Sequence, residues 1–187
     1  MINRFYLQNQ ELIQKQFFRE GIVVLFDILT PEILAKIKIE LSKTKWTKDH
    51  HILTYSYSTA LLTPVIKHLI SSPEFQHLIF KICQQKASLF QFQLISCTWR
   101  NYTLLHDSQS KPPKYEIILD FTNDWDPKAG GFITYTNGTG EYIKLPQHNN
   151  MLAVVNRKHQ PNKFIQYCNH YAKGKQRIIL FGSILPK

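Results

Sequence analysis

Histidine and aspartate stand side by side at positions 106 and 107, and this pair is the feature of the sequence best suited to metal chemistry. Imidazole and carboxylate groups are common ligands of divalent metals. On a strand, side chains at i and i+2 leave the same face, whereas those at i and i+1 leave opposite faces. Here the i+2 residue is Ser108. One strand therefore aims His106 and Asp107 at one metal only if a β-bulge intervenes, and we interpret the pair as the remnant of a metal site.

The other histidines do not offer a better metal-binding pair. No His is followed two positions later by Asp or Glu; the eight stand at positions 50, 51, 68, 77, 106, 148, 159 and 170. Asp49, His50 and His51 lie in a basic connection over 43–51, and either a small metal or phosphate site or a solvated loop fits them. We favour the loop, because adjacent His residues in a loop lack a fixed geometry. For His170, beside Asn169, a structural hydrogen-bonding role is the simpler interpretation.

The elements that would position these residues differ between the two halves of the chain. Residues 5–20 are mildly amphipathic, and 21–26 form an apolar, β-branched run that predicts a buried strand. Thr-Pro-Glu at 30–32 is typical of a helix start, and apolar residues at helical spacing continue that helix to about 43. Further helices are predicted over 61–70 and 74–85.

From about residue 88 the pattern changes to short strands separated by turns. We predict strands over 89–100, 115–121, 132–135 and 151–155, and a final hairpin of 163–171 with 177–185. Many short strands at this spacing are typical of a sandwich or jelly roll. The predicted class is therefore α+β in a single domain over 1–187. Its mainly helical flank, 1–87, is expected to pack on one sheet of the β core, 88–187.

Composition indicates a folded, basic protein. Hydrophobic residues make up 43% of the 187 residues, and the formal net charge is +10. That charge favours acidic partners such as RNA, an acidic protein surface or anionic lipid, without choosing among them. Three cysteines without a CxxC spacing favour reduced thiols and a cytoplasmic location. We find neither a signal-peptide pattern nor an apolar run long enough for a membrane span.

Basic and aromatic residues alternate near the C-terminus. The pattern fits a surface for single-stranded nucleic acid, in which bases stack on aromatic rings. It also fits an ordinary strand with alternate residues buried and solvated, which we favour. The residues are Arg157, Lys158, Lys163, Lys173 and Lys175, with Phe164, Tyr167 and Tyr171.

Several short motifs occur in the order found in one enzyme family. They are Tyr102–Asp107, Asp124–Pro127, Gly130–Phe132, Gly140-Glu141, Asn150–Val155 with Arg157, and Asn169-His170, preceded by Phe5–Gln8 and Gly21–Leu29. Together they resemble the C-terminal domain of the eukaryotic two-domain ribosomal-protein prolyl hydroxylases, which are 2-oxoglutarate/Fe(II) oxygenases. The resemblance implies a double-stranded β-helix (jelly roll) flanked by N-terminal helices. It also implies a domain that has lost its metal ligands and serves in structure and partner binding.

The same resemblance identifies the residues that an active site would need. In active oxygenases of this fold, a His opens the strand before the final hairpin, and a basic residue on the next strand binds the 2-oxoglutarate carboxylate. Arg177 stands at the basic position, but Lys163 or Phe164 stands where the His is expected. A surviving site would use His106, Asp107 and His170 for Fe(II), with Arg177 for 2-oxoglutarate.

We expect instead a pseudoenzyme with no catalytic residues and no cofactor. Such an oxygenase-like module would bind or support a protein or ribonucleoprotein with an acidic surface, and RNA itself is a further candidate. Two alternatives stay open. One is a divergent 2-oxoglutarate/Fe(II)-dependent prolyl hydroxylase with a rearranged metal triad, and the other is a structural domain beside a separately encoded catalytic partner.

Overall fold

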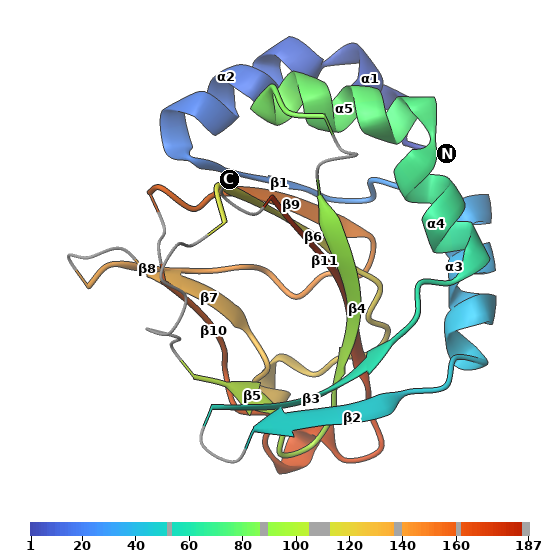
Figure 1. Ribbon diagram of the computed structural model, residues 1–187, viewed down its shortest axis with the longest axis vertical. Coiled ribbons are helices and arrows are strands. Elements are labelled where there is room, and N and C mark those ends of the chain that lie inside the picture. Colours follow the sequence, from blue (N-terminus) through green and yellow to red (C-terminus); the bar gives the residue numbers. More distant parts are fainter. Residues whose placement is uncertain (52–53, 87–89, 105–112, 137–139, 160–161, 185–187) are drawn as a thin grey trace.

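The computed structural model describes residues 1–51, 54–86, 90–104, 113–136, 140–159 and 162–184. A large antiparallel sheet runs through the molecule, with helices packed on one face and a small second sheet facing the other (Figure 1). The predicted α+β jelly roll with N-terminal helices is confirmed. Among the described residues, no helix is long and apolar enough to cross a membrane.

The predicted helices are present, with ends that differ by a few residues. Proline occupies the first turn of three of them, and at two N-termini a hydroxyl group caps the helix: Thr63 Oγ1 accepts from Ile66 N–H and Ser72 Oγ from Phe75 N–H. The helices are α1 Arg4–Gln8, α2 Gln10–Glu20, α3 Pro31–Ser42, α4 Pro64–Ser71 and α5 Pro73–Cys83.

Two sheets make up the β part. The large sheet has the order β1-β9-β6-β11-β4-β3-β2, with β5 paired to β3, and the small sheet has the order β10-β7-β8. The strands are β1 Ile22–Leu25, β2 Thr47–His51, β3 Tyr55–Ala60, β4 Gln91–Cys97, β5 Tyr102–Thr103, β6 Tyr115–Asp120, β7 Ile133–Thr136, β8 Tyr142–Lys144, β9 Met151–Asn156, β10 Asn162–Ile165 and β11 Arg177–Ser183. Two short 3-10 turns, η2 Pro127–Ala129 and η3 His170–Ala172, complete the described elements.

Two sequence-based expectations were wrong. The final hairpin does not exist, because β10 pairs with β7 in the small sheet while β11 lies between β4 and β6 in the large one. The connection over 43–51 is not a loop throughout, since 47–51 forms edge strand β2 against β3. Its Thr-Lys-Asp-His-His sequence lacks apolar alternation because both of its faces are largely exposed. The first half of the chain thus contributes β1, β2 and β3 as well as helices.

Strand β6 explains how polar groups enter the interior. Tyr115, Ile117 and Leu119 face the core beneath the helices, and Ile118 faces the core between the two sheets. Side chains alternate along a strand, so Glu116 and Asp120 share the face of Ile118. The fold therefore places two carboxylates in the interior between the sheets, and both are buried.

Candidate functional site

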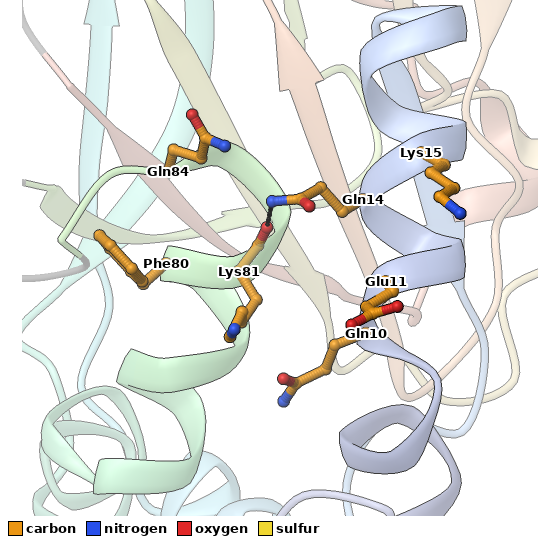
Figure 2. Close-up of a pocket in the computed structure, with 7 residues that line it drawn as sticks. All are labelled: Gln10, Glu11, Gln14, Lys15, Phe80, Lys81 and Gln84. Atoms are coloured by element: carbon orange, nitrogen blue, oxygen red, sulfur yellow. Dashed lines mark hydrogen bonds between the residues drawn. The ribbon is translucent and has the colours of Figure 1, made fainter.

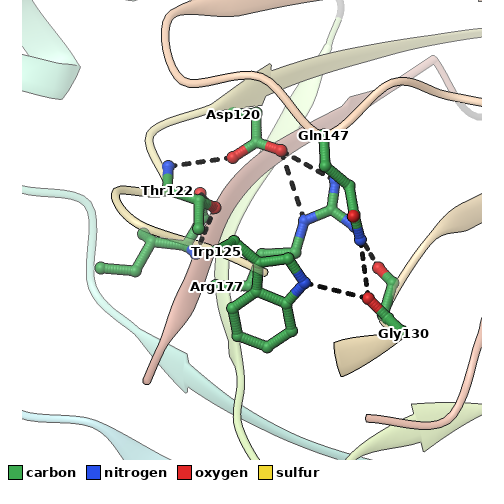
Figure 3. Close-up of polar contacts among 8 residues, drawn as sticks. Asp120, Thr122, Trp125, Gly130, Gln147 and Arg177 are labelled. Atoms are coloured by element: carbon green, nitrogen blue, oxygen red, sulfur yellow. Dashed lines mark hydrogen bonds and ion pairs between the residues drawn. The ribbon is translucent and has the colours of Figure 1, made fainter. Parts of the chain in front are cut away.

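A buried ion pair between Asp120 and Arg177 lies at one end of this interior. Arg177 Nη2 is 2.8 Å and its Nε 3.3 Å from Asp120 Oδ2, and both side chains are fully buried. The second terminal nitrogen of Arg177 donates to the carbonyl of Gly131. Asp120 Oδ1 accepts from the backbone N–H of Thr122 at 2.9 Å (Figure 3). The carboxylate and the guanidinium are thus bonded to partners within the chain.

The Gly130-Gly131 turn holds the carbonyl that Arg177 uses. Trp125 Nε1 and Gln147 Nε2 both donate to Gly130 O, at 2.9 and 2.7 Å (Figure 3). Both glycines have positive φ, and a Cβ on Gly130 would lie 2.3 Å from the carbonyl oxygen of Tyr167. Only glycine fits such a close approach of two backbone segments.

A second polar cluster occupies the same interior further along β6. Glu116 Oε1 is 2.7 Å from Arg157 Nη1 and 2.9 Å from Lys163 Nζ, while its Oε2 accepts from Tyr135 Oη at 2.6 Å. Burial raises the pKa of Glu116, but the charges of Lys163 and Arg157 outweigh it and hold that pKa below its usual value. Burial, followed by the nearby Glu116 charge, raises the pKa of the Tyr135 hydroxyl well above its usual value. Glu116 is therefore ionised at neutral pH and Tyr135 is a neutral donor.

Two thiols lie beside the Asp120–Arg177 pair. Cys97 is the β-sheet partner of Arg177, and Cys97 and Cys168 are both fully buried free thiols. A hydrogen bond with Cys97 lowers the pKa of Cys168, while the same bond, with burial, raises that of Cys97 well above the usual value. The lower-pKa thiol is thus Cys168, and neither sulfur is exposed to solvent.

The predicted metal ligands are only partly described. His106 and Asp107 lie outside the described residues. His170 is exposed on η3, with its ring centroid 4.3 Å from that of Tyr171. On β2, Asp49 accepts a hydrogen bond from Tyr55, and His51 bonds to Thr54. Over the ranges that the structure describes, no three His, Cys, Asp or Glu side chains lie close enough together to hold a metal ion.

Two residues of the alternating basic and aromatic pattern near the C-terminus turn inward. Arg157 and Lys163 contact Glu116, and their side chains are 6% and 26% exposed. They belong to the interior cluster, so a nucleic-acid surface built from this pattern would lack both residues. The signal that could have revealed the interior cluster is Tyr-Glu-Ile-Ile-Leu-Asp at 115–120, where two acids stand four positions apart on one face of an apolar strand.

A surface pocket lies elsewhere, between α2 and α5 (Figure 2). It has a volume of about 590 Å³, and a hydrogen bond of 2.5 Å from Gln14 Nε2 to Lys81 O joins the two helices there. Its lining residues are Gln10, Glu11, Gln14, Lys15, Phe80, Lys81 and Gln84. The pocket is lined from α2, α5 and the α5 C-cap and has no contribution from the strands that carry the interior clusters.

Comparison with known proteins gives matches at two levels. The prolyl 3-hydroxylase OGFOD1 of Xenopus laevis is 31% identical over 110 residues, which is 51% of this chain and 21% of that protein. The chain resembles prolyl hydroxylases of the 2-oxoglutarate/Fe(II) oxygenase family. The matched stretch spans only about a fifth of the OGFOD1 chain. No protein-family model matches the sequence.

Solved prolyl hydroxylases share the fold over nearly the whole chain. A prolyl-4-hydroxylase of Pseudomonas putida has a TM-score of 0.73 at 11% identity, covering 96% of this chain and all of the other. A prolyl hydroxylase of Trichoplax adhaerens, solved with a hypoxia inducible factor peptide fragment, also gives 0.73 at 11% identity, covering 98% and 93%. At this identity the likeness establishes the double-stranded β-helix fold and not the activity.

The interior can be tested for its fit to the cofactors of prolyl hydroxylases. The guanidinium of Arg177, the expected 2-oxoglutarate partner, is already bonded to a carboxylate and a carbonyl of the chain. Lys163, one of two residues standing where a ligand His is expected, places its ammonium on Glu116. An ammonium group has three donors and no lone pair to offer a metal. The described residues therefore do not fit a 2-oxoglutarate/iron pair.

Proposed function

We propose that this chain is a non-catalytic, oxygenase-like module that binds or supports a protein or ribonucleoprotein with an acidic surface. The observation that supports it is the buried Asp120–Arg177 pair. In an active prolyl hydroxylase, the corresponding basic residue would bind the carboxylate of 2-oxoglutarate. Here an internal carboxylate occupies that role, so Arg177 is part of the core.

The energetics of the pair support this proposal. A dicarboxylate that enters must displace Asp120 and leave its charge buried without a cation, which costs about 3–5 kcal/mol. This cost corresponds to an affinity about 100- to 4,000-fold weaker than for an unblocked site. Asp120 also keeps its backbone bond to Thr122 N–H, which holds the carboxylate in place.

The charge of the protein supports an acidic partner. The net charge is +10, although Arg157 and Lys163 are used internally. Lys158 and Lys173 are exposed and Lys175 is partly exposed, so these three lysines are candidates for a basic face that binds the partner. We also propose that residues 1–187 form a single domain. The free thiols are in keeping with a cytoplasmic location, which we propose as well.

Two alternatives compete with this proposal. A divergent prolyl hydroxylase would use His106, Asp107 and His170 for Fe(II) and Arg177 for 2-oxoglutarate, and the shared fold favours it. A structural domain beside a separate catalytic partner is favoured by the match to only a fifth of OGFOD1.

Calorimetric titration with Mn(II) and 2-oxoglutarate tests the non-catalytic proposal. We expect no binding at micromolar concentrations, either by the wild-type chain or by the His106→Ala variant. Micromolar binding by the wild type that His106→Ala abolishes would overturn the proposal and establish the divergent hydroxylase. Binding that persists in that variant but is lost in Arg177→Met would also overturn it.

A further inference from the structure

We propose that the surface formed by the β4–β5 connection and the η3 region binds unpaired RNA. This surface, called here the Trp99 surface, consists of Trp99, Arg100, Tyr167, Tyr171 and Lys173. Figure 1 places β5 and the orange-red η3 at the end of the molecule opposite α1, α2 and α5. The inference rests on the proposed binding function and specifies its partner.

Hydrogen bonds and ring contacts join these residues into one surface. Arg100 N–H donates to the carbonyl of Cys168 at 2.7 Å, which ties the β4–β5 connection to the segment before η3. The rings of Tyr102 and Tyr167 are 6.4 Å apart across this junction. The Lys173 ammonium lies 4.5 Å from the Trp99 ring centroid. This contact joins the residue that follows η3 to the β4–β5 connection.

Trp99 fixes the position of two positive charges. The Arg100 guanidinium carbon lies 4.2 Å from its ring centroid, and Lys173 Nζ packs on the same ring. Cation–π contacts of this kind hold a long side chain without neutralising it. In the described part of the chain, ion pairs are made by Arg19, Arg157, Lys163 and Arg177, so neither of these two cations is offset by a carboxylate there. Among the described residues, the surface thus presents two ordered positive charges without a carboxylate partner.

Arg100 has a backbone conformation that a side chain with a β-carbon disfavours. Its φ is +72°, in the left-handed region. The turn around it is held by Asn101, whose Oδ1 accepts from Thr98 N–H at 2.7 Å and whose N–H donates to Thr98 O at 3.0 Å. Glycine would fit this turn with less strain. An arginine at such a position suggests that its side chain serves recognition.

Exposed aromatic residues stand on the same segment as Lys173, next to the Cys168 carbonyl that Arg100 bonds. Tyr167 and Tyr171 are 50% and 48% exposed, and the ring of His170 lies against that of Tyr171 in a tilted arrangement. Unpaired bases stack on aromatic rings while basic side chains bind the phosphates, so a surface with both groups fits a single strand. A duplex hides its base faces, so the surface fits an unpaired strand, and the ribonucleoprotein partner of the proposed function favours RNA as that strand. An acidic protein would use the charges but gain less from flat, half-exposed rings.

Fluorescence anisotropy with a labelled uridylate dodecamer and the full chain tests this inference. Neutralising two phosphates, one for each cation of the surface, predicts an affinity loss of about sevenfold between 50 and 200 mM salt. Arg100→Gly removes a charge while relieving the turn, so weaker binding is expected in a protein that is at least as stable as the wild type. Its matched control is Gln84→Gly, since Gln84 also has a positive φ but lies at the end of α5.

The stacking part of the inference has its own variants. Replacing both Tyr167 and Tyr171 by Ala is expected to weaken binding by about 30-fold or more, because each ring contributes at least the lower end of base–aromatic stacking, about fivefold. Tyr142→Ala, at an exposed tyrosine of β8, is the control and should leave affinity unchanged.

Each comparison ligand gives a decisive outcome. Preference for the uridylate over an RNA duplex, a thymidylate dodecamer and a polyglutamate peptide supports the inference. If the duplex binds as tightly as the uridylate and the tyrosine substitutions do not change affinity, the inference is overturned in favour of phosphate attraction alone. A preference for the thymidylate would overturn it in favour of DNA. If only polyglutamate binds, the RNA inference fails while the non-catalytic module survives, because Mn(II) and 2-oxoglutarate binding is tested independently.

Discussion

Replacing Asp120 by alanine should expose the energetic role of the interior ion pair. The change leaves the fully buried Arg177 with the Gly131 carbonyl but without its carboxylate. Breaking a buried pair from one side costs about 3–5 kcal/mol of unfolding free energy, because the remaining charge stays desolvated. We expect the same range for Arg177→Met, which leaves Asp120 with only the Thr122 N–H.

The double variant Asp120→Leu with Arg177→Met should lose far less unfolding free energy than the sum of the losses in the two single variants. Apolar replacements for a buried pair are often neutral, because two desolvation costs disappear with the attraction. The unpaired Gly131 carbonyl adds a cost of about 1–3 kcal/mol. We therefore expect the double variant to lie within about 3 kcal/mol of the wild type, with a large favourable coupling between the two positions.

Urea unfolding followed by tryptophan fluorescence would measure these free energies. A second readout is rescue, since Asp120→Ala opens space for a small carboxylate beside Arg177. Acetate at ten times its dissociation constant would restore about 1.4 kcal/mol to this variant and nothing to the wild type. Single variants that lose under about 1 kcal/mol, far below the range for a broken buried pair, together with no acetate effect, would refute the argument that Arg177 is committed to the core.

Further predictions concern protonation and backbone packing. The folded-state pKa of Glu116 lies below the reference value of 4.5, so its stabilising effect is present above that pH and is lost as pH falls through the folded pKa. The stability difference between wild type and Glu116→Gln should therefore shrink in unfolding experiments below pH 4.5, and a constant difference would contradict the buried cluster. Burial, with the charge of Asp49 next, raises the pKa of Tyr57 to about 12, so removing this residue should delete a late-titrating phenol from the absorbance titration. Gly130→Ala should lower the unfolding free energy by more than about 2 kcal/mol in thermal unfolding, because the new Cβ meets a backbone carbonyl. Gly174→Ala, with open space around it, should cost about 1 kcal/mol. Equal effects of the two changes would argue against the close approach at Gly130.

Local patterns were enough to predict the fold class, the helices and several strands, but not β2, β3, β5 and β8. Thr30-Pro31-Glu32 and Ser72-Pro73-Glu74 indicate helix starts, and α3 and α5 begin at those prolines. The change of period near residue 88 indicates the jelly roll, because hydrophobic spacing reports local geometry. The order of short motifs indicated the prolyl hydroxylase resemblance. The helix starts, the change of period and each single motif are contained in neighbouring residues, and only the order of the motifs spans the chain.

Tertiary structure alone decided which polar groups meet. The pairing of Asp120 with Arg177 joins positions 57 residues apart, and that of Glu116 with Lys163 joins positions 47 apart. Lys163 in sequence looks like one more surface cation, yet β10 joins the small sheet and turns it toward Glu116. The alternation along a strand predicts which residues share a face of the sheet, but what packs against that face depends on long-range strand pairing. The interior ion pairs therefore follow from topology, because only the packing of the two sheets desolvates these charges and obliges them to find partners.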